Sequence, residues 1–360
     1  MEIIETLRKE AKSIGLFLPL AETPAQIAAL DQTASLHGRT VENRAVLLMQ
    51  PCYDADETGA PTAETVARYC KAVQQRAYGM LWSEPIAVTP EARADAHQLM
   101  ITPENKDAFA ALLRAVEQAS TEAHGLAPVQ VALLGHAGAE ALTPVTVEQH
   151  SFLPEGTAQL TDDDLTRLVV SCGEAAALCE QAGFSGAALD AEAGTLFGSS
   201  LSAYDREGRF GGDFDDRTRF LRDCCTAMHM ALDQAFMTVR LSLSDGIPQP
   251  DGWGMGFEDP TAPDLDEPVL LLEILRQLYG VELVNCTVGR KDMNWAGAED
   301  AERELIRISR LCTCIAMADS DLQQNVQLIV PETPEQSVPF TNLAAGMVGG
   351  EFASYAGYAG

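Results

Sequence analysis

The chain has 360 residues, and its 24 lysines and arginines stand against 53 aspartates and glutamates, for a net charge of −29 at pH 7. Nucleic acids and anionic membrane surfaces bind positive potential, so this charge argues against both as partners. Hydrophobic residues make up 46% of the chain and charged residues 21%, which predicts a globular protein with a sizeable core.

Cysteine usage and the first residues bear on the compartment. Residues 1–12 form a charged amphipathic stretch, and no apolar run approaches the roughly 18 residues of a membrane span. We therefore expect a cytoplasmic protein without a signal peptide. The nine cysteines include the close pairs Cys224–Cys225 and Cys312–Cys314, but no second pair stands near either. Metal and iron–sulfur sites need several spaced thiolates, so we interpret these cysteines as packed helix thiols and expect no bound metal.

Strand-like apolar runs alternate with helical patterns along the chain. We predict strands at 44–50, 79–85, 128–134, 184–190, 236–242, 281–287, 326–331 and 351–357. We predict helices at 63–77, 104–120, 162–182, 217–234, 268–279, 298–317 and 335–347. This alternation implies a parallel sheet, and about eight repeats favour a (β/α)8 TIM barrel over a doubly wound sheet. Nothing resembles a linker, so we predict one α/β domain over 1–360.

Two further features concern the outside of this barrel. The helix at 162–182 has Thr161 as its expected N-cap, acidic residues in its first turn and Gly183 at its end. If 351–357 is the eighth strand, the last helix of the barrel is missing. The apolar face left uncovered there predicts low stability, a homo-oligomer, or association with a partner.

Function in such barrels collects at the carboxyl ends of the strands. His136 follows the third predicted strand, Asp190 and Glu192 end the fourth, and Arg240 interrupts the otherwise apolar fifth. A buried arginine must meet an anion or a set of acceptors, which leaves a bound ligand and an internal ion pair equally open. The long segment 189–221 contains GRFGG, whose glycines we interpret as turn formers, because no dinucleotide-binding G-x-G-x-x-G occurs in the chain.

Several motifs occur together in a familiar order. They are NRAVLLMQP at 43–51, LWSEPIAVTPEARADAHQL at 81–99, GHAG at 135–138, LSAYDREGRFGGDFDDRTRFLRD at 201–223, VRLSLSDG at 239–246 and NLAAGM at 342–347. Together they resemble the old yellow enzyme family of FMN-dependent NADH:flavin oxidoreductase and dienoyl-CoA reductase barrels, in particular its anaerobic bacterial branch. The resemblance spans about residues 30–360 and implies FMN across the strand ends, NAD(P)H as reductant, and a small-molecule acceptor such as an activated alkene.

The resemblance holds at some of the family's functional positions and fails at others. Arg240 matches the arginine beside the flavin N1–C2 region, and Pro51, Cys52, Glu84 and Gly357 match other cofactor-binding strand ends. Other positions depart from the family pattern. The substrate-binding His-x-x-His or His-x-x-Asn pair is replaced by Asp190 and Ala193, the tyrosine proton donor by Thr195, the flavin-binding glutamine by Leu133, and two arginines by Ala139 and Gly360.

These departures leave two hypotheses. Losing two or three polar contacts removes about 3–6 kcal/mol, which would make FMN binding weak or abolish it. In an active enzyme, Asp190, Glu192 and His136 are the candidate catalytic residues, the alternatives being solvated loop carboxylates and a structural histidine. The other hypothesis is a degenerate, non-catalytic barrel that acts as a scaffold or as a binding subunit of an active relative. Longer relatives carry an iron–sulfur segment and a nucleotide domain; this chain ends before both, so we expect no cluster.

Overall fold

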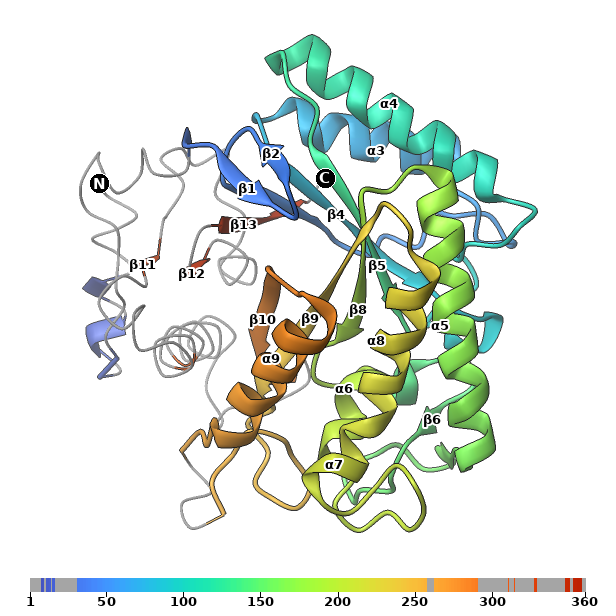
Figure 1. Ribbon diagram of the computed structural model, residues 1–360, viewed down its shortest axis with the longest axis vertical. Helices are drawn as coiled ribbons and strands as arrows, with labels where there is room; N and C mark the ends of the chain where they lie inside the picture. The colour runs from blue at the N-terminus through green and yellow to red at the C-terminus, as the bar shows by residue number, and fades with distance from the viewer. Residues whose placement is uncertain are drawn as a thin grey trace.

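A computed structural model describes residues 8–9, 11–13, 15–16, 31–257, 262–290, 310, 314, 327–328, 347–349 and 352–357. Its parallel strands are β3 (Ala45–Met49), β4 (Met80–Ala87), β5 (Val129–Gly135), β8 (Gly186–Ala191), β9 (Phe236–Ser244), β10 (Val284–Val288) and β13 (Phe352–Gly357). They pair in the order β10-β9-β8-β5-β4-β3-β13 and form a curled sheet (Figure 1). Successive strands are neighbours, and the last strand lies beside the first, which confirms the predicted barrel class.

The predicted seventh strand is the exception. Of residues 326–331, the structure describes β11 (Gln327–Leu328), which pairs antiparallel with β12 (Met347–Gly349). β12 in turn pairs antiparallel with β13. β11 is thus a strand inside the predicted segment and runs in the same direction as β13, but the antiparallel strand β12, which was not predicted, lies between the two. The other predicted strands agree with the structure to within a few residues.

Helices cover the outer face of the sheet (Figure 1). They are α3 (Ala63–Gln74), α4 (Lys106–His124), α5 (Asp162–Ala182), α8 (Arg219–Ala231) and α9 (Asp266–Tyr279). α5 has its predicted bounds: the Thr161 hydroxyl accepts the N–H of Asp164, and Gly183 ends the helix at a left-handed φ of 110°. The helices predicted at 298–317 and 335–347 fall almost wholly outside the described residues. In the part of the chain that the structure describes, no helix is long and apolar enough to cross a membrane.

Alternating strand residues build two apolar layers. Leu47 and Leu81 point outward and pack with helix residues such as Val73 and Leu112. The residues that point inward fill the barrel, and include Val46, Met80, Trp82, Val131, Leu133 and Phe236. A hairpin of β1 (Ala34–Leu36) and β2 (Arg39–Val41) adds its own side chains to this inner cluster. Because Met80 and Phe236 begin their strands, the hairpin packs at the amino end of the barrel, which leaves the carboxyl end for function.

Close packing at the amino end can be tested at Gly186, the first residue of β8. A Cβ on this residue would lie 2.6 Å from ring carbons of Phe236. We expect Gly186→Ala to lower the free energy of unfolding by about 1–3 kcal/mol in urea denaturation, because overpacking forces the ring aside. Adding Phe236→Leu should recover part of this loss. Strict additivity of the two changes would contradict the steric explanation.

Candidate active site

The carboxyl end of β8 and the middle of β9 hold a buried ion pair. Asp190 and Arg240 are direct partners in the register of these two strands. The Arg240 Nε donates to Asp190 Oδ1 at 2.7 Å, and Nη2 donates to Oδ2 at 2.6 Å. Nη2 also lies 3.0 Å from Glu192 Oε2. The geometry is a bidentate arginine–carboxylate pair with a second carboxylate at its edge.

The three side chains of this ion pair are largely buried, and Arg240 keeps its charge. The Asp190 and Glu192 side chains are 2% and 9% exposed, and that of Arg240 is 14% exposed. The alternative of solvated loop carboxylates is therefore wrong, and the internal ion pair is confirmed. Burial lowers the pKa of Arg240, but Asp190 and Glu192 raise it above its ordinary value. The guanidinium therefore stays charged between two carboxyl groups.

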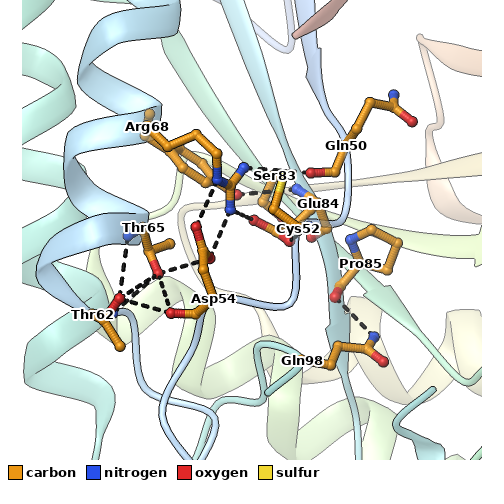
Figure 2. Close-up of polar contacts among 11 residues, drawn as sticks. Gln50, Cys52, Asp54, Thr62, Thr65, Arg68, Ser83, Glu84, Pro85 and Gln98 are labelled. Atoms are coloured by element: carbon orange, nitrogen blue, oxygen red, sulfur yellow. Dashed lines mark hydrogen bonds and ion pairs between the residues drawn. The ribbon is translucent and has the colours of Figure 1, made fainter. Parts of the chain in front are cut away.

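A second ion-pair cluster lies at the ends of β3 and β4 (Figure 2). Arg68 of α3 donates from Nε to Asp54 Oδ2 at 2.7 Å and from Nη2 to Glu84 Oε1 at 2.5 Å. The other Glu84 oxygen accepts the N–H of Cys52 at 3.1 Å. Burial raises the pKa of Glu84 although Arg68 opposes the shift. Glu84 thus ties the loop after β3 to α3, and its expected contact with a cofactor stays a prediction.

The other predicted cofactor positions flank this cluster. Pro51 is partly buried, and Cys52 is exposed at the end of β3. Partial burial raises the pKa of the Cys52 thiol, so the thiol is protonated at neutral pH. Gly357 ends β13 beside Met49 of β3. Sequence reasoning missed Arg68 and Asp54, although a basic residue among the apolar positions of the helix at 63–77 was a usable signal.

His136 lies at the end of β5 and is 3% exposed. Its Nδ1 is 3.0 Å from the N–H of Gly138, so it accepts this hydrogen bond and the neutral ring carries its proton on Nε2. Burial lowers the pKa of His136 to about 4. The ring is therefore neutral at pH 7, which allows it to donate a hydrogen bond but not to act as a cationic acid.

The positions that depart from the family pattern have structural tasks here. Leu133 is buried in the inner apolar cluster. Thr195 stands where the family has its tyrosine, and its hydroxyl accepts the N–H of Gly198 as the cap of the short helix α6 (Leu196–Ser199). Ala193 is buried and carries no polar group. No proton donor replaces the missing tyrosine at these three positions.

The long loop at 189–221 is held by its own arginines. Arg206 and Arg217 side chains are each 3% exposed. Arg206 donates to the Leu160 carbonyl at 2.9 Å and pairs with Asp162 at 2.7 Å. Arg217 donates to the carbonyls of Leu201 at 3.0 Å and Gly212 at 3.1 Å, and pairs with Glu267. These cations shape the loop and are not available to a ligand.

The glycines of this loop are turn formers, as predicted. Gly208 and Gly212 have left-handed φ values of 105° and 101°. A Cβ on Gly211 would lie 2.4 Å from the Cβ of Arg206. The loop therefore needs glycine for its backbone path. The paired thiols of Cys224 and Cys225 are buried in α8, and within residues that the structure describes no cluster of three His, Cys, Asp or Glu residues could hold a metal.

The chain belongs to a known family. A model of the NADH:flavin oxidoreductase / NADH oxidase family matches residues 35–255, more than half of the sequence. This range contains the Arg68 cluster, His136, Asp190 and Arg240. The chain is thus a member of this family, in agreement with its resemblance to old yellow enzymes. No curated protein sequence matches it significantly.

Solved structures support the same fold. A 2-naphthoyl-CoA reductase complexed with 2-naphthoyl-CoA superposes with a TM-score of 0.69 at 15% identity, over 84% of this chain but 46% of that one. The present chain thus spans about half the length of that reductase. The old yellow enzyme homologue of Zymomonas mobilis has a TM-score of 0.57 at 19% identity, over 74% of this chain and 75% of its own. Old Yellow Enzyme from Pichia sp. AKU4542 has a TM-score of 0.61 at 16% identity, over 76% and 74%.

The family implies FMN, and the charge of Arg240 tests whether the residues fit its ring. The Nε and Nη2 atoms of Arg240 are taken by carboxylates. Nη1 has no hydrogen bond to any residue in the described ranges, and the side chain keeps 14% exposure. The Nη1 amino group, with its two N–H donors, therefore suits a neutral ring carbonyl, so the residues fit the ring with fewer donors than a whole guanidinium offers. Residues 358–360, expected near the phosphate, lie outside the described residues.

A buried carboxyl joins two loops near this end of the barrel. Glu148 Oε1 accepts the N–H of Asp205 at 3.0 Å, while Oε2 is buried and has no hydrogen bond to a described residue. Burial raises the pKa of Glu148 to about 7, with Asp205 and Asp251 adding to the shift and Arg206 opposing it. The folded protein therefore binds a proton at Glu148 that the unfolded chain releases at lower pH.

This shift predicts a pH-dependent stability. The contribution of neutral Glu148 is complete below its unfolded pKa and is lost as the pH rises through about 7. We expect Glu148→Gln, which stays neutral, to melt about 2–4 °C above the wild type at pH 8 and close to it at pH 5. Calorimetry at both pH values measures this difference. The exposed Glu155 of the same loop provides the control variant Glu155→Gln, and an equal response of both variants would contradict the assignment.

Proposed function

We propose that the chain is an FMN-dependent oxidoreductase that takes hydride from NAD(P)H and passes it to a small acceptor with an activated double bond. The observation that carries the proposal is the position of Arg240. It lies in the middle of β9, level with the carboxyl end of β8, in a barrel of a flavin oxidoreductase family, and its side chain is 14% exposed. A cation at this place suits the electron-rich edge of a flavin ring.

Each candidate residue has a limited task in this proposal. A bound flavin supplies the hydride transfer. Arg240 would hold a ring carbonyl through Nη1, and the exposed Cys52 would border the ring at the end of β3. His136 would donate a hydrogen bond from Nε2 to the acceptor. Asp190 is committed to Arg240, so Glu192 is the carboxyl group better suited to proton transfer.

A second candidate is a non-catalytic barrel that binds a partner or a small ligand. The specific observation in its favour is the pairing of Arg240 with Asp190 and Glu192, together with the apolar Leu133 and Ala193 and a Thr195 hydroxyl that caps a helix. Flavin binding separates the two candidates, because a scaffold has no need of the cofactor.

The cofactor can be tested by reconstitution. We expect wild-type protein incubated with FMN and then desalted to keep the visible absorption of bound flavin. Arg240→Lys should weaken FMN binding at least tenfold, since an ammonium loses the planar fork of donors. Arg240→Leu should retain no flavin.

Folding has to be checked beside flavin retention. Thermal unfolding without FMN reports whether each variant is folded, because Arg240→Leu leaves Asp190 and Glu192 buried without their cation. Arg240→Lys keeps a charge and serves as the folded variant if Arg240→Leu unfolds. A wild type that binds no FMN and oxidises no NAD(P)H would overturn the proposal in favour of the non-catalytic barrel.

A further inference from the structure

Asp190 is paired with Arg240 in the ligand-free protein. We propose that Asp190 and Glu192 compete with the flavin for Arg240, acting as an internal counter-anion that sets how tightly the protein retains its cofactor. This inference rests on the proposed function. In the resemblance to old yellow enzymes, Asp190 occupies a substrate-binding histidine position, so its role here is a new one.

The pair is built into the sheet and not into a flexible loop. Asp190 and Arg240 face each other in the β8–β9 register. Asp190 Oδ1 also accepts the N–H of Glu192 at 3.2 Å, which fixes the carboxylate. On the other side, a Cβ on Gly135 would lie 3.4 Å from Asp190 Oδ2, so the backbone of β5 packs against the same group. Asp190 therefore has little freedom to leave Arg240 when a ligand binds.

Charge decides the competition. A carboxylate is an ionised acceptor, and its bidentate pairing with arginine is among the strongest hydrogen-bonded contacts in proteins. A flavin carbonyl is neutral and cannot displace it from Nε and Nη2. The flavin is left with Nη1, because the carboxyl groups of Asp190 and Glu192 occupy Nε and Nη2. In Asp190→Asn a single neutral amide oxygen replaces the two carboxylate oxygens, which should free one N–H donor of Arg240 and strengthen FMN binding about tenfold.

A purely structural pair predicts a different result. If Asp190 only ties β8 to β9, its loss lowers stability and leaves FMN affinity unchanged or weaker. If Asp190 competes with the cofactor, the same substitution lowers the stability of the free protein and raises its affinity for FMN. The two measurements together distinguish the roles, because stability alone moves in both cases.

The experiment compares wild type, Asp190→Asn and Glu192→Gln with a matched control. The control is Asp162→Asn. Asp162, at the start of α5, pairs with the buried Arg206 of the long loop, and the substitution removes its charge. FMN affinity is measured by quenching of flavin fluorescence, and thermal unfolding is recorded with and without FMN. We expect Asp190→Asn to bind FMN at least tenfold more tightly than wild type and to gain more from FMN in its melting temperature. The control should lose stability without gaining affinity.

The outcomes separate the inference from the proposed function. If wild type binds FMN and a folded Asp190→Asn binds it no more tightly, the inference is overturned and the proposed function stands. If Asp190→Asn does not fold, Glu192→Gln decides, because it leaves the bidentate contact in place and should bind FMN several-fold more tightly than wild type. Unchanged affinity in that variant overturns the inference. If no variant binds FMN, wild type included, the proposed function fails and the inference with it.

Discussion

A guanidinium buried in the middle of a strand requires negative charge beside it, and the register of β8 and β9 supplies that charge at Asp190. Glu192 adds a second carboxylate from the same strand end. This one pairing explains why Arg240 can be present without a ligand and why the carboxylates are buried. It also means that any ligand meets a cation that is already balanced, so binding at this place depends on what the carboxylates leave exposed.

Arginines in the surrounding segments are also paired with carboxylates of the protein itself. Arg68 is shared by Asp54 and Glu84, and Arg206 and Arg217 each bind backbone carbonyls and one carboxylate. In a chain with a net charge of −29, each buried cation thus has acidic residues within reach. The arginines of the long loop shape the carboxyl end of the barrel, and we expect the flavin to be held through Arg240.

Much of the fold could be predicted because each element carries local signals. The helix Asp162–Ala182 has its cap at Thr161 and its stop at Gly183, and the apolar strand runs are separated by such helices. The strand expected at 326–331 is present at Gln327–Leu328, but the antiparallel strand β12 lies between it and β13, because a short apolar run does not specify which strand lies beside it.

The sequence predicted which residues belong to the site, but not which of them contact one another. Arg240, Asp190, Glu192 and His136 were named from their places at strand ends, but their sequence positions leave open whether an arginine meets a ligand or a carboxylate. That choice depends on the register between β8 and β9, a property of two segments about fifty residues apart in the chain. Arg68 was missed for the same reason, since its partners Asp54 and Glu84 come from different segments.

The most direct test of this account is the hydrogen exchange of the Arg240 Nε–H in the ligand-free protein, observed by NMR with labelled arginine. The account predicts slow exchange at neutral pH, because Nε is buried and donates to Asp190. Arg167, whose side chain is 71% exposed, gives the rate of a solvated arginine in the same sample. An Arg240 Nε–H that exchanges as fast as that of Arg167 would show that the ion pair is open, and would contradict the account.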